Sequence, residues 1–261
     1  MIYQLNEPAI DMQMLERLTP NNYTRRIKSH FYAYSTKYDF CRFFAVDDYD
    51  SHLGIICVFN SSMMVSMFEG VTFGEDTLSE IASFVVMNKP FSVEFPVQYA
   101  PALERMCSIE YLGDKRTEFA FAAAGELPSL DVQELPRLDD VYSILAQCFP
   151  AIKNNHGLWL TDTSHRVRRG LAQSFILEGC TTATVQYIID KVALIGHVGT
   201  LPEERGKHHA RKLLYWIGEK LTADGFEVRL FARPHRVSYY EEIGFKKCGL
   251  DIVLERKDKD F

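Results

Sequence analysis

The stretch that decides the fold is T-L-P-E-E-R-G-K-H-H-A-R-K, residues 200–212. It follows an apolar run typical of a β-strand, 192–200, and leads into a segment whose apolar residues have helical spacing. These residues are Ala210, Leu213, Leu214, Ile217 and Leu221. The sequence therefore predicts a strand, a short basic loop and a helix whose end is marked by Gly225.

The loop between this strand and this helix carries a glycine among cations. The first turn of a helix has four backbone N–H groups without intrahelical acceptors and a partial positive charge, and such an end binds phosphate. Gly206 lets a bulky anion approach the backbone, and Arg205 can pair with phosphate oxygens through its forked guanidinium. Lys207, His208 and His209 add positive potential at the rim. The stretch predicts a pyrophosphate cradle; the alternative is an ordinary loop before a basic, solvated helix start.

The residues around the loop match a known pattern. The run V-G-T-L-P-E-E-R-G-K-H-H-A-R-K-L-L, 198–214, resembles the signature of the GNAT superfamily of acyl-CoA-dependent N-acyltransferases. In that family, Gln/Arg-x-x-Gly-x-Gly/Ala opens the central helix after a strand. Arg205 stands at the Gln/Arg position and Ala210 at the last position, whereas His208 replaces the usual glycine.

The resemblance implies a way of holding acetyl-CoA as co-substrate. The backbone near Val198, Gly199 and Thr200 would bind the pantetheine arm like an added strand. The helix start would hold the pyrophosphate. The residues expected there are Arg205, Gly206, Lys207, His208, His209 and Ala210.

A second element lies about thirty residues further on. The run Y-Y-E-E-I-G-F, 239–245, looks like the family's Tyr-x-x-x-Gly-Phe element, with Tyr240 at the aromatic position. The resemblance implies that Tyr240 is the general acid that protonates the departing thiolate. The alternative for Tyr240 is a packed helix-end residue with its hydroxyl bonded to backbone. Arg233 stands where the family often has Asn, and we expect it to contact the same cofactor.

The sequence does not single out a general base. Three residues near predicted strands are candidates: Glu178, Asp190 and His197. A lone histidine in a strand is more often a core residue than a base. A water relay to solvent is the alternative to all three.

The length of 261 residues and the alternation of strand and helix signals predict an α/β or α+β chain with two domains. The stretch 124–135, with Gly125 and Pro128, reads as a linker. We expect a first domain at 1–126 and a GNAT-like domain with a mixed sheet at 131–261. The first domain has a similar order of elements, so a degenerate copy of the same fold is expected there. Its helix at 76–88 starts with acidic residues, which predicts no coenzyme A binding.

The composition argues against several other classes of protein, among them nucleic-acid-binding, membrane and secreted proteins. The net charge of −6 argues against a nucleic-acid partner, and no apolar run reaches the length that spans a bilayer. The start of the chain is not a secretory signal. Six scattered cysteines without C-x-x-C pairs favour free thiols in a cytoplasmic protein, and no metal site is expected.

Three functions remain open on the sequence alone. The first is an enzyme that transfers an acetyl group from acetyl-CoA to a primary amine, with a small-molecule acceptor favoured over a protein. The second is a non-catalytic protein that binds acyl-CoA and senses its level. The third is a binder of another phosphate-bearing ligand. The acceptor, the acyl chain length and the oligomeric state are not encoded in any motif found here.

Overall fold

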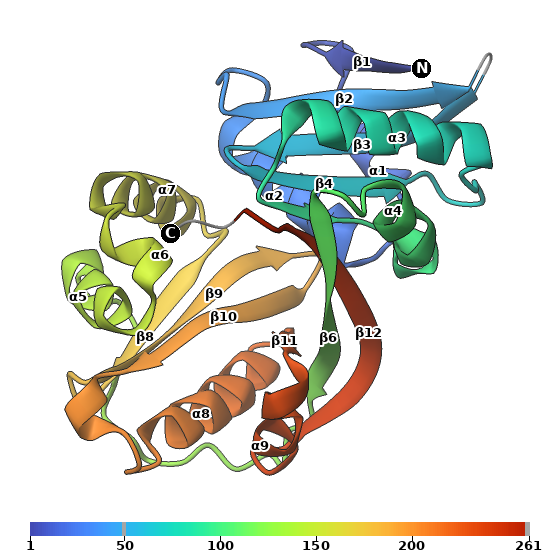
Figure 1. Ribbon diagram of the computed structural model, residues 1–261. Helices are drawn as coiled ribbons and strands as arrows, with labels where there is room; N and C mark the ends of the chain where they lie inside the picture. Colours follow the sequence, from blue (N-terminus) through green and yellow to red (C-terminus); the bar gives the residue numbers. More distant parts are fainter. Residues whose placement is uncertain (49–50, 259–261) are drawn as a thin grey trace. The chain divides into compact units, whose positions relative to one another are not determined.

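The computed structural model describes residues 1–48 and 51–258 and has mixed α/β architecture (Figure 1). The described residues form two compact units: Met1–Arg116 with residues 250–258, and Thr117–Gly249. Each boundary lies inside a long strand, β6 (Tyr111–Phe121) or β12 (Phe245–Arg256). These bounds differ from the predicted domains 1–126 and 131–261, because the strand partners of β6 and β12 are a tertiary property that no local sequence signal reports.

The first unit is a sheet with the order β1-β2-β3-β4-β5-β12. Its strands pair antiparallel except for β4 and β5, which are parallel. The helix α3 begins after Gly74 and carries Glu75 and Asp76 in its first turn, as the sequence indicated. The elements are β1 (Ile2–Leu5), α1 (Met12–Glu16), α2 (Asn22–Tyr34), β2 (Cys41–Asp48), β3 (Ser51–Phe59), β4 (Ser62–Met67), α3 (Glu75–Asn88), β5 (Ser92–Glu94), η1 (Val97–Tyr99) and α4 (Ala100–Met106).

The second unit is a sheet with the order β12-β6-β11-β10-β9-β8-β7. The strands β10 and β11 are parallel, and β9 pairs antiparallel with β8 and β10. The elements are β7 (Val132–Gln133), α5 (Leu138–Cys148), α6 (Pro150–Lys153), α7 (His156–Arg168), β8 (Gln173–Leu177), β9 (Thr181–Ile189), β10 (Val192–Thr200), η2 (Pro202–Glu204), α8 (His209–Ala223), β11 (Glu227–Ala232), η3 (Pro234–Arg236) and α9 (Val237–Glu241).

The helix α8 connects the two parallel strands β10 and β11 (Figure 1). Four residues of its predicted apolar stripe, Leu213, Leu214, Ile217 and Leu221, are at most 3% exposed, whereas Ala210 is half-buried. The helix ends as predicted at Gly225, whose φ of +89° suits glycine. The amides of Gly225 and Phe226 donate to the carbonyls of Thr222 and Leu221, which satisfies the last turn.

The segment predicted as a linker is attached to α8. The carboxylate of Glu219, which is 3% exposed, accepts hydrogen bonds from the amides of Ala124 and Gly125 at 2.6 and 3.0 Å. Within the same stretch, β7 pairs with β8. The residues after β6 are therefore part of the second unit.

The structure also bears on the cysteines and on the length and composition of the helices. All six cysteines are free. Among the described residues, no helix combines the length and the apolar character that crossing a membrane requires.

Candidate active site

A cavity forms in the second unit where β10 and β11 diverge. Their parallel register runs from Val192 opposite Glu227 to Ile195 opposite Leu230, and it ends there. Beyond this point β10 contains one extra residue relative to β9 between Gly196 and Gly199, a β-bulge that bends the strand. The space between the two strands has a volume of about 340 Å³. Strands that separate in this way leave edge groups available to an extended ligand.

Residues of β10, β11, α8, η3 and α9 line this cavity, together with Phe149 between α5 and α6. Ala210 borders it from the first turn of α8, and Tyr240 borders it from α9. Other lining residues are Phe149, His197, Val198, Arg236 and Tyr239. Ala210, which follows the predicted phosphate loop, and the predicted catalytic residue Tyr240 thus border one cavity, whereas Arg205–His208 do not line it.

Tyr240 is held by aromatic neighbours in the cavity wall. Its ring centroid lies 6.0 Å from those of Phe119 and Phe245 and 5.3 Å from that of Tyr239. Burial raises the pKa of Tyr240 above its usual 10, Tyr239 adds to this increase, and Arg236 opposes it. The phenol is therefore protonated throughout the neutral range, as a proton donor must be.

The predicted phosphate loop, Arg205–His208, is exposed. The first backbone bond into α8 is donated by the amide of Lys212 to the carbonyl of His208 at 3.0 Å. The amides of His209, Ala210 and Arg211 therefore precede the first intrahelical bond and have no acceptor within the helix. This end of α8 can accept an anion.

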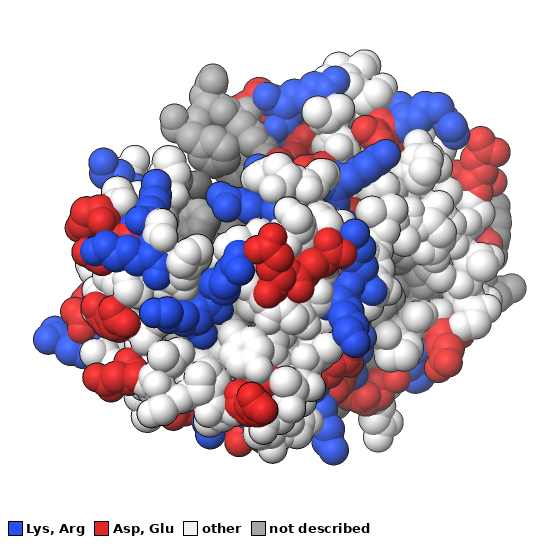
Figure 2. Space-filling model, turned by 90° about the horizontal axis from the view of Figure 1, so that it is seen from below, with Lys and Arg blue, Asp and Glu red and all other residues white. Residues whose placement is uncertain are grey.

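Two cations at this end of α8, Lys207 and Arg211, are paired with carboxylates. Lys207 donates to Glu204 at 2.7 Å, which lowers the pKa of the Glu204 carboxyl, and Arg211 donates to Glu242 at 2.5 Å. Figure 2 shows the same pattern more widely, with basic and acidic side chains intermingled on the face that it views. A phosphate at this loop would therefore compete with carboxylates for the cations.

His208 has a left-handed backbone, with φ of +62°, at the N-cap of α8. This conformation favours glycine, the residue that the GNAT pattern has at this position. His208 thus keeps the loop geometry at an energetic cost that glycine would avoid. Its side chain makes no capping hydrogen bond to the helix.

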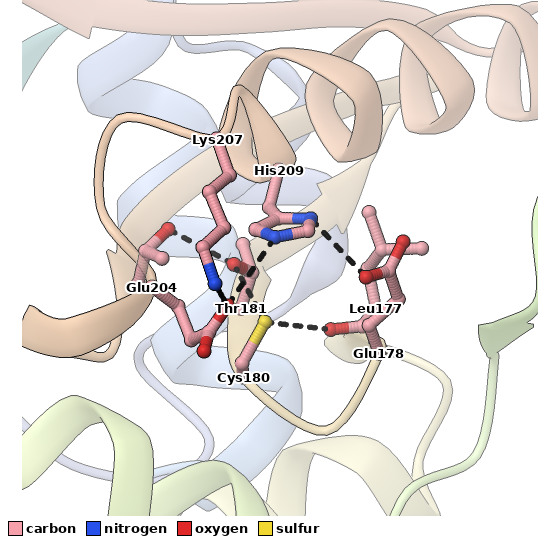
Figure 3. Close-up of polar contacts among 8 residues, drawn as sticks. Leu177, Glu178, Cys180, Thr181, Glu204, Lys207 and His209 are labelled. Carbon is pink, nitrogen blue, oxygen red and sulfur yellow. Dashed lines mark hydrogen bonds and ion pairs between the residues drawn. The ribbon is translucent and has the colours of Figure 1, made fainter.

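His209 does not share the exposure of the loop. It is 7% exposed and lies beside Glu178, Cys180 and Glu204, which come from the turn after β8 and from η2 (Figure 3). The sequence analysis placed Lys207, His208 and His209 together at the rim. The imidazole of His209 instead lies in the interior behind the loop, so only its backbone amide is placed to meet an anion.

Part of the strand that was predicted to bind the pantetheine arm already has partners within the protein. Val198 lines the cavity, while Gly199 and Thr200 pair with Thr182 and Thr181 of β9. The carbonyl of Thr200 accepts hydrogen bonds from Arg205 Nε and Cys148 Sγ, each at 3.3 Å. A ligand strand would find this carbonyl occupied.

Arg233 lies at the end of β11 and is exposed. It is not among the residues that line the cavity, whereas Arg236, three positions later, is. The sequence did not single out Arg236, because only the three-dimensional turn of η3 brings it to the cavity wall.

The three candidate bases lie in different places. His197 lines the cavity, in a left-handed conformation inside the bulge of β10 and 5.8 Å from the ring of Phe149. Glu178 lies in the turn between β8 and β9, and Asp190 in the turn between β9 and β10. Of the three, His197 alone borders the cavity.

No family model matches this sequence, and no match was found among curated proteins. Similar solved structures exist. A GNAT-family acetyltransferase from Colwellia psychrerythraea is 12% identical, with a TM-score of 0.59 over 98% of this chain and 99% of that chain. A GCN5-related N-acetyltransferase from Kribbella flavida is 11% identical, with a TM-score of 0.58 over 92% and 97%. A tandem GNAT protein from the clavulanic acid biosynthesis pathway is 12% identical, with a TM-score of 0.56 over 82% of each chain.

These likenesses establish the fold: the chain has the mixed α/β fold of GNAT acetyltransferases. The predicted resemblance and fold class are confirmed at this level. The sequence motifs lie at 198–214 and 239–245, whereas the structural likeness to the Colwellia protein extends over nearly the whole chain.

Proposed function

We propose that this chain is an N-acetyltransferase that moves the acetyl group of acetyl-CoA to the primary amine of a small molecule. One observation carries the proposal: a single cavity is bordered by Ala210 at the amide-rich start of α8 and by Tyr240, a protonated phenol. The GNAT-like fold supports the same activity. We place the protein in the cytoplasm in this proposal. The net charge of −6, and the mixed charges on the face seen in Figure 2, support a protein that binds neither nucleic acid nor an acidic membrane surface.

In the proposed binding mode, the first-turn amides of α8 and the loop Arg205–His208 hold the pyrophosphate. The pantetheine arm enters between β10 and β11 past Val198. Arg236, rather than Arg233, is the cationic side chain next to the reacting end.

In the proposed reaction, the neutral amine attacks the thioester carbonyl carbon. A C–N bond forms, the C–S bond breaks, and the leaving thiolate takes the phenolic proton of Tyr240. The ammonium proton passes to water, with His197 as the nearest candidate to assist. Solvent then returns a proton to Tyr240, and the products are the amide and coenzyme A.

The second candidate is a non-catalytic acyl-CoA sensor. The carbonyl of Thr200 is occupied and Lys207 and Arg211 are paired, which would weaken cofactor binding in a way that suits a sensor.

Two measurements test these proposals. Acetyl-CoA should raise the melting temperature in a concentration-dependent way, because a ligand that binds only the native state stabilises it. Release of the coenzyme A thiol in the presence of a panel of small amines then separates the enzyme from the sensor. Stabilisation by other nucleotides and not by any coenzyme A ester would overturn both.

A further inference from the structure

Three segments of the second unit meet behind the phosphate loop. The turn after β8 brings Cys180, η2 brings Glu204, and the first residue of α8 is His209 (Figure 3). One donor atom from each of these residues lies within 4.8 Å of the other two. The chain therefore places a thiol, a carboxylate and an imidazole around one point.

His209 is an unsatisfied buried group. It is 7% exposed, and neither ring nitrogen has a hydrogen-bond partner among the described residues. Its Nε2 lies 3.6 Å from Glu204, and its Nδ1 lies 3.5 Å from Glu178. Both nitrogens thus face carboxylates beyond good hydrogen-bond distance, an arrangement that native proteins rarely leave unexplained.

We propose that Cys180, Glu204 and His209 bind a divalent cation of the zinc type. Thiolate, imidazole and carboxylate form the donor set that zinc takes, whereas calcium and magnesium prefer oxygen donors alone. Nε2 of His209 faces the cation, and Nδ1–H donates to Glu178. A metal-bound histidine usually gives its second N–H to a carboxylate in this way.

The geometry requires only side-chain adjustment. Zinc–ligand distances of about 2.0–2.3 Å place tetrahedral donor atoms roughly 3.3–3.8 Å apart. Nε2 of His209 and the Glu204 carboxylate already have this separation, at 3.6 Å, and no pair of the three donors has to close by more than about 1.5 Å from the 4.8 Å limit. The fourth position belongs to water.

The local charges balance when the cation is bound. The negative charges are the thiolate of Cys180 and the carboxylates of Glu204 and Glu178. They are offset by the two charges of the cation and by the ammonium of Lys207, which donates to Glu204. The Cys180 thiol releases its proton to solvent on binding, so the affinity for the cation falls at low pH.

The site has a defined relation to the phosphate loop. Glu204 and His209 stand immediately before and after Arg205–His208, so a cation shared by them holds both ends of the loop. Cys180 then ties the loop to the β8–β9 turn. The cation sets the shape of the loop from behind. This proposal reverses the expectation from sequence that no metal site exists; the ligands come from three segments whose spacing matches no zinc motif.

The test is metal titration of the full chain after treatment with a chelator. We expect one equivalent of Co²⁺ to bind and to produce a thiolate-to-cobalt charge-transfer absorption, which Zn²⁺ abolishes by displacement. Cys180→Ser should remove the absorption, and His209→Asn should weaken Co²⁺ binding at least tenfold. Cys248→Ser is the matched control, because Cys248 is an exposed free thiol of the same unit, and it should bind Co²⁺ like the parent.

Circular dichroism accompanies each titration. If Cys180→Ser does not fold, Glu204→Gln and His209→Asn carry the test. The proposal is overturned if the folded parent takes up no stoichiometric Co²⁺, or if uptake is unchanged in the folded ligand variants. Acetyl-CoA stabilisation is measured on the same chelator-treated protein, so failure of the metal site and failure of the proposed transferase are separate results.

Discussion

Gly218 of α8 lies directly against the ring of Phe121 in β6. A Cβ built on Gly218 would come within 2.6 Å of three atoms of that ring. The ring cannot retreat, because it is 9% exposed and packs edge-on against Tyr215 and Phe245. The absence of a side chain at Gly218 is what lets α8 approach the sheet.

Gly218→Ala should therefore destabilise the protein, although alanine is the better helix former. Alanine gains about 1 kcal/mol in helix propensity, whereas overpacking a core costs about 1–3 kcal/mol. We expect a net loss of about 1 kcal/mol in the free energy of unfolding, measured by urea denaturation. The control is Gly157→Ala in α7, where the added methyl meets no atom within 4 Å and should stabilise. Equal stabilisation by both changes would contradict this account.

Helical periodicity made α8 predictable, since four residues of one stripe and the glycine after the last turn act locally. The sequence alone predicts two strands, FKKCGL (245–250) and DIVLER (251–256), where the structure has the single long strand β12. Gly249 lies inside this strand, and a Cβ there would approach Glu118 Oε2 to 2.7 Å. In place of α7 the sequence predicts a shorter helix, 164–172, because the residues before Ser164, including Gly157 and Thr161, are weak helix formers.

Asp251 supplies a prediction for the first unit. It is 3% exposed and accepts a hydrogen bond from the hydroxyl of Tyr23 at 2.8 Å. Burial raises the pKa of Asp251, repulsion from Glu94 adds to this increase, and the Tyr23 hydrogen bond opposes it. The folded protein therefore holds this proton more tightly than the unfolded chain does.

A raised folded-state pKa contributes stability that is complete below the unfolded value of about 3.9 and is lost as pH rises through the folded value. Asp251→Asn keeps the acceptor oxygen for Tyr23 and removes the ionisation. We expect the free energy of unfolding of Asp251→Asn, relative to the parent, to increase from pH 4 to pH 7 in urea titrations. If the difference in the free energy of unfolding between Asp251→Asn and the parent is constant across these pH values, ionisation of Asp251 does not destabilise the folded protein.

His208 and Gly206 form a pair of opposite predictions. Both have positive φ, +62° and +84°, in an exposed loop. His208→Gly should raise the free energy of unfolding by about 0.5 kcal/mol, because relief of a left-handed backbone, about 1–2 kcal/mol, exceeds the entropic cost of glycine, about 0.5–1 kcal/mol. Gly206→Ala introduces the same strain and should destabilise by about 1 kcal/mol. Thermal unfolding without ligand measures both, and a loss of stability in His208→Gly would mean that the imidazole makes a contact worth more than the strain.

The sequence located the loop and Tyr240 because both belong to contiguous patterns. It did not place the imidazole of His209 in the interior or bring Arg236 to the cavity. The position of His209 depends on how η2 and the β8–β9 turn meet, and that of Arg236 depends on the turn of η3. No local spacing in the sequence encodes either arrangement. The departure at His208 could be read from the sequence, but its physical meaning, a left-handed residue with a side chain, needed the backbone angles.

Tyr240→Phe tests the proposed chemistry directly. Loss of a general acid typically costs 10²–10⁴ in rate, so we expect kcat with an accepted amine to fall about 100-fold. Stabilisation by acetyl-CoA should persist, because the ring and its packing against Phe119 and Phe245 remain. The comparison variant is Tyr239→Phe, which removes the neighbouring hydroxyl and keeps the aromatic ring. Arg211 lies over this ring, 5.6 Å from its centroid. The decrease in kcat should be much smaller in Tyr239→Phe than in Tyr240→Phe.

The pH profile separates an acid role for Tyr240 from a packing role. Because burial raises the pKa of Tyr240 above 10, its phenol stays protonated, and kcat should show no loss from its ionisation until the pH exceeds 10. A general acid is lost as it ionises, so any alkaline limb due to Tyr240 lies above that pH and is absent from Tyr240→Phe. Retention of full kcat in Tyr240→Phe, with a large loss in Tyr239→Phe, would transfer the role to Tyr239 and leave Tyr240 as a packing residue of the cavity wall.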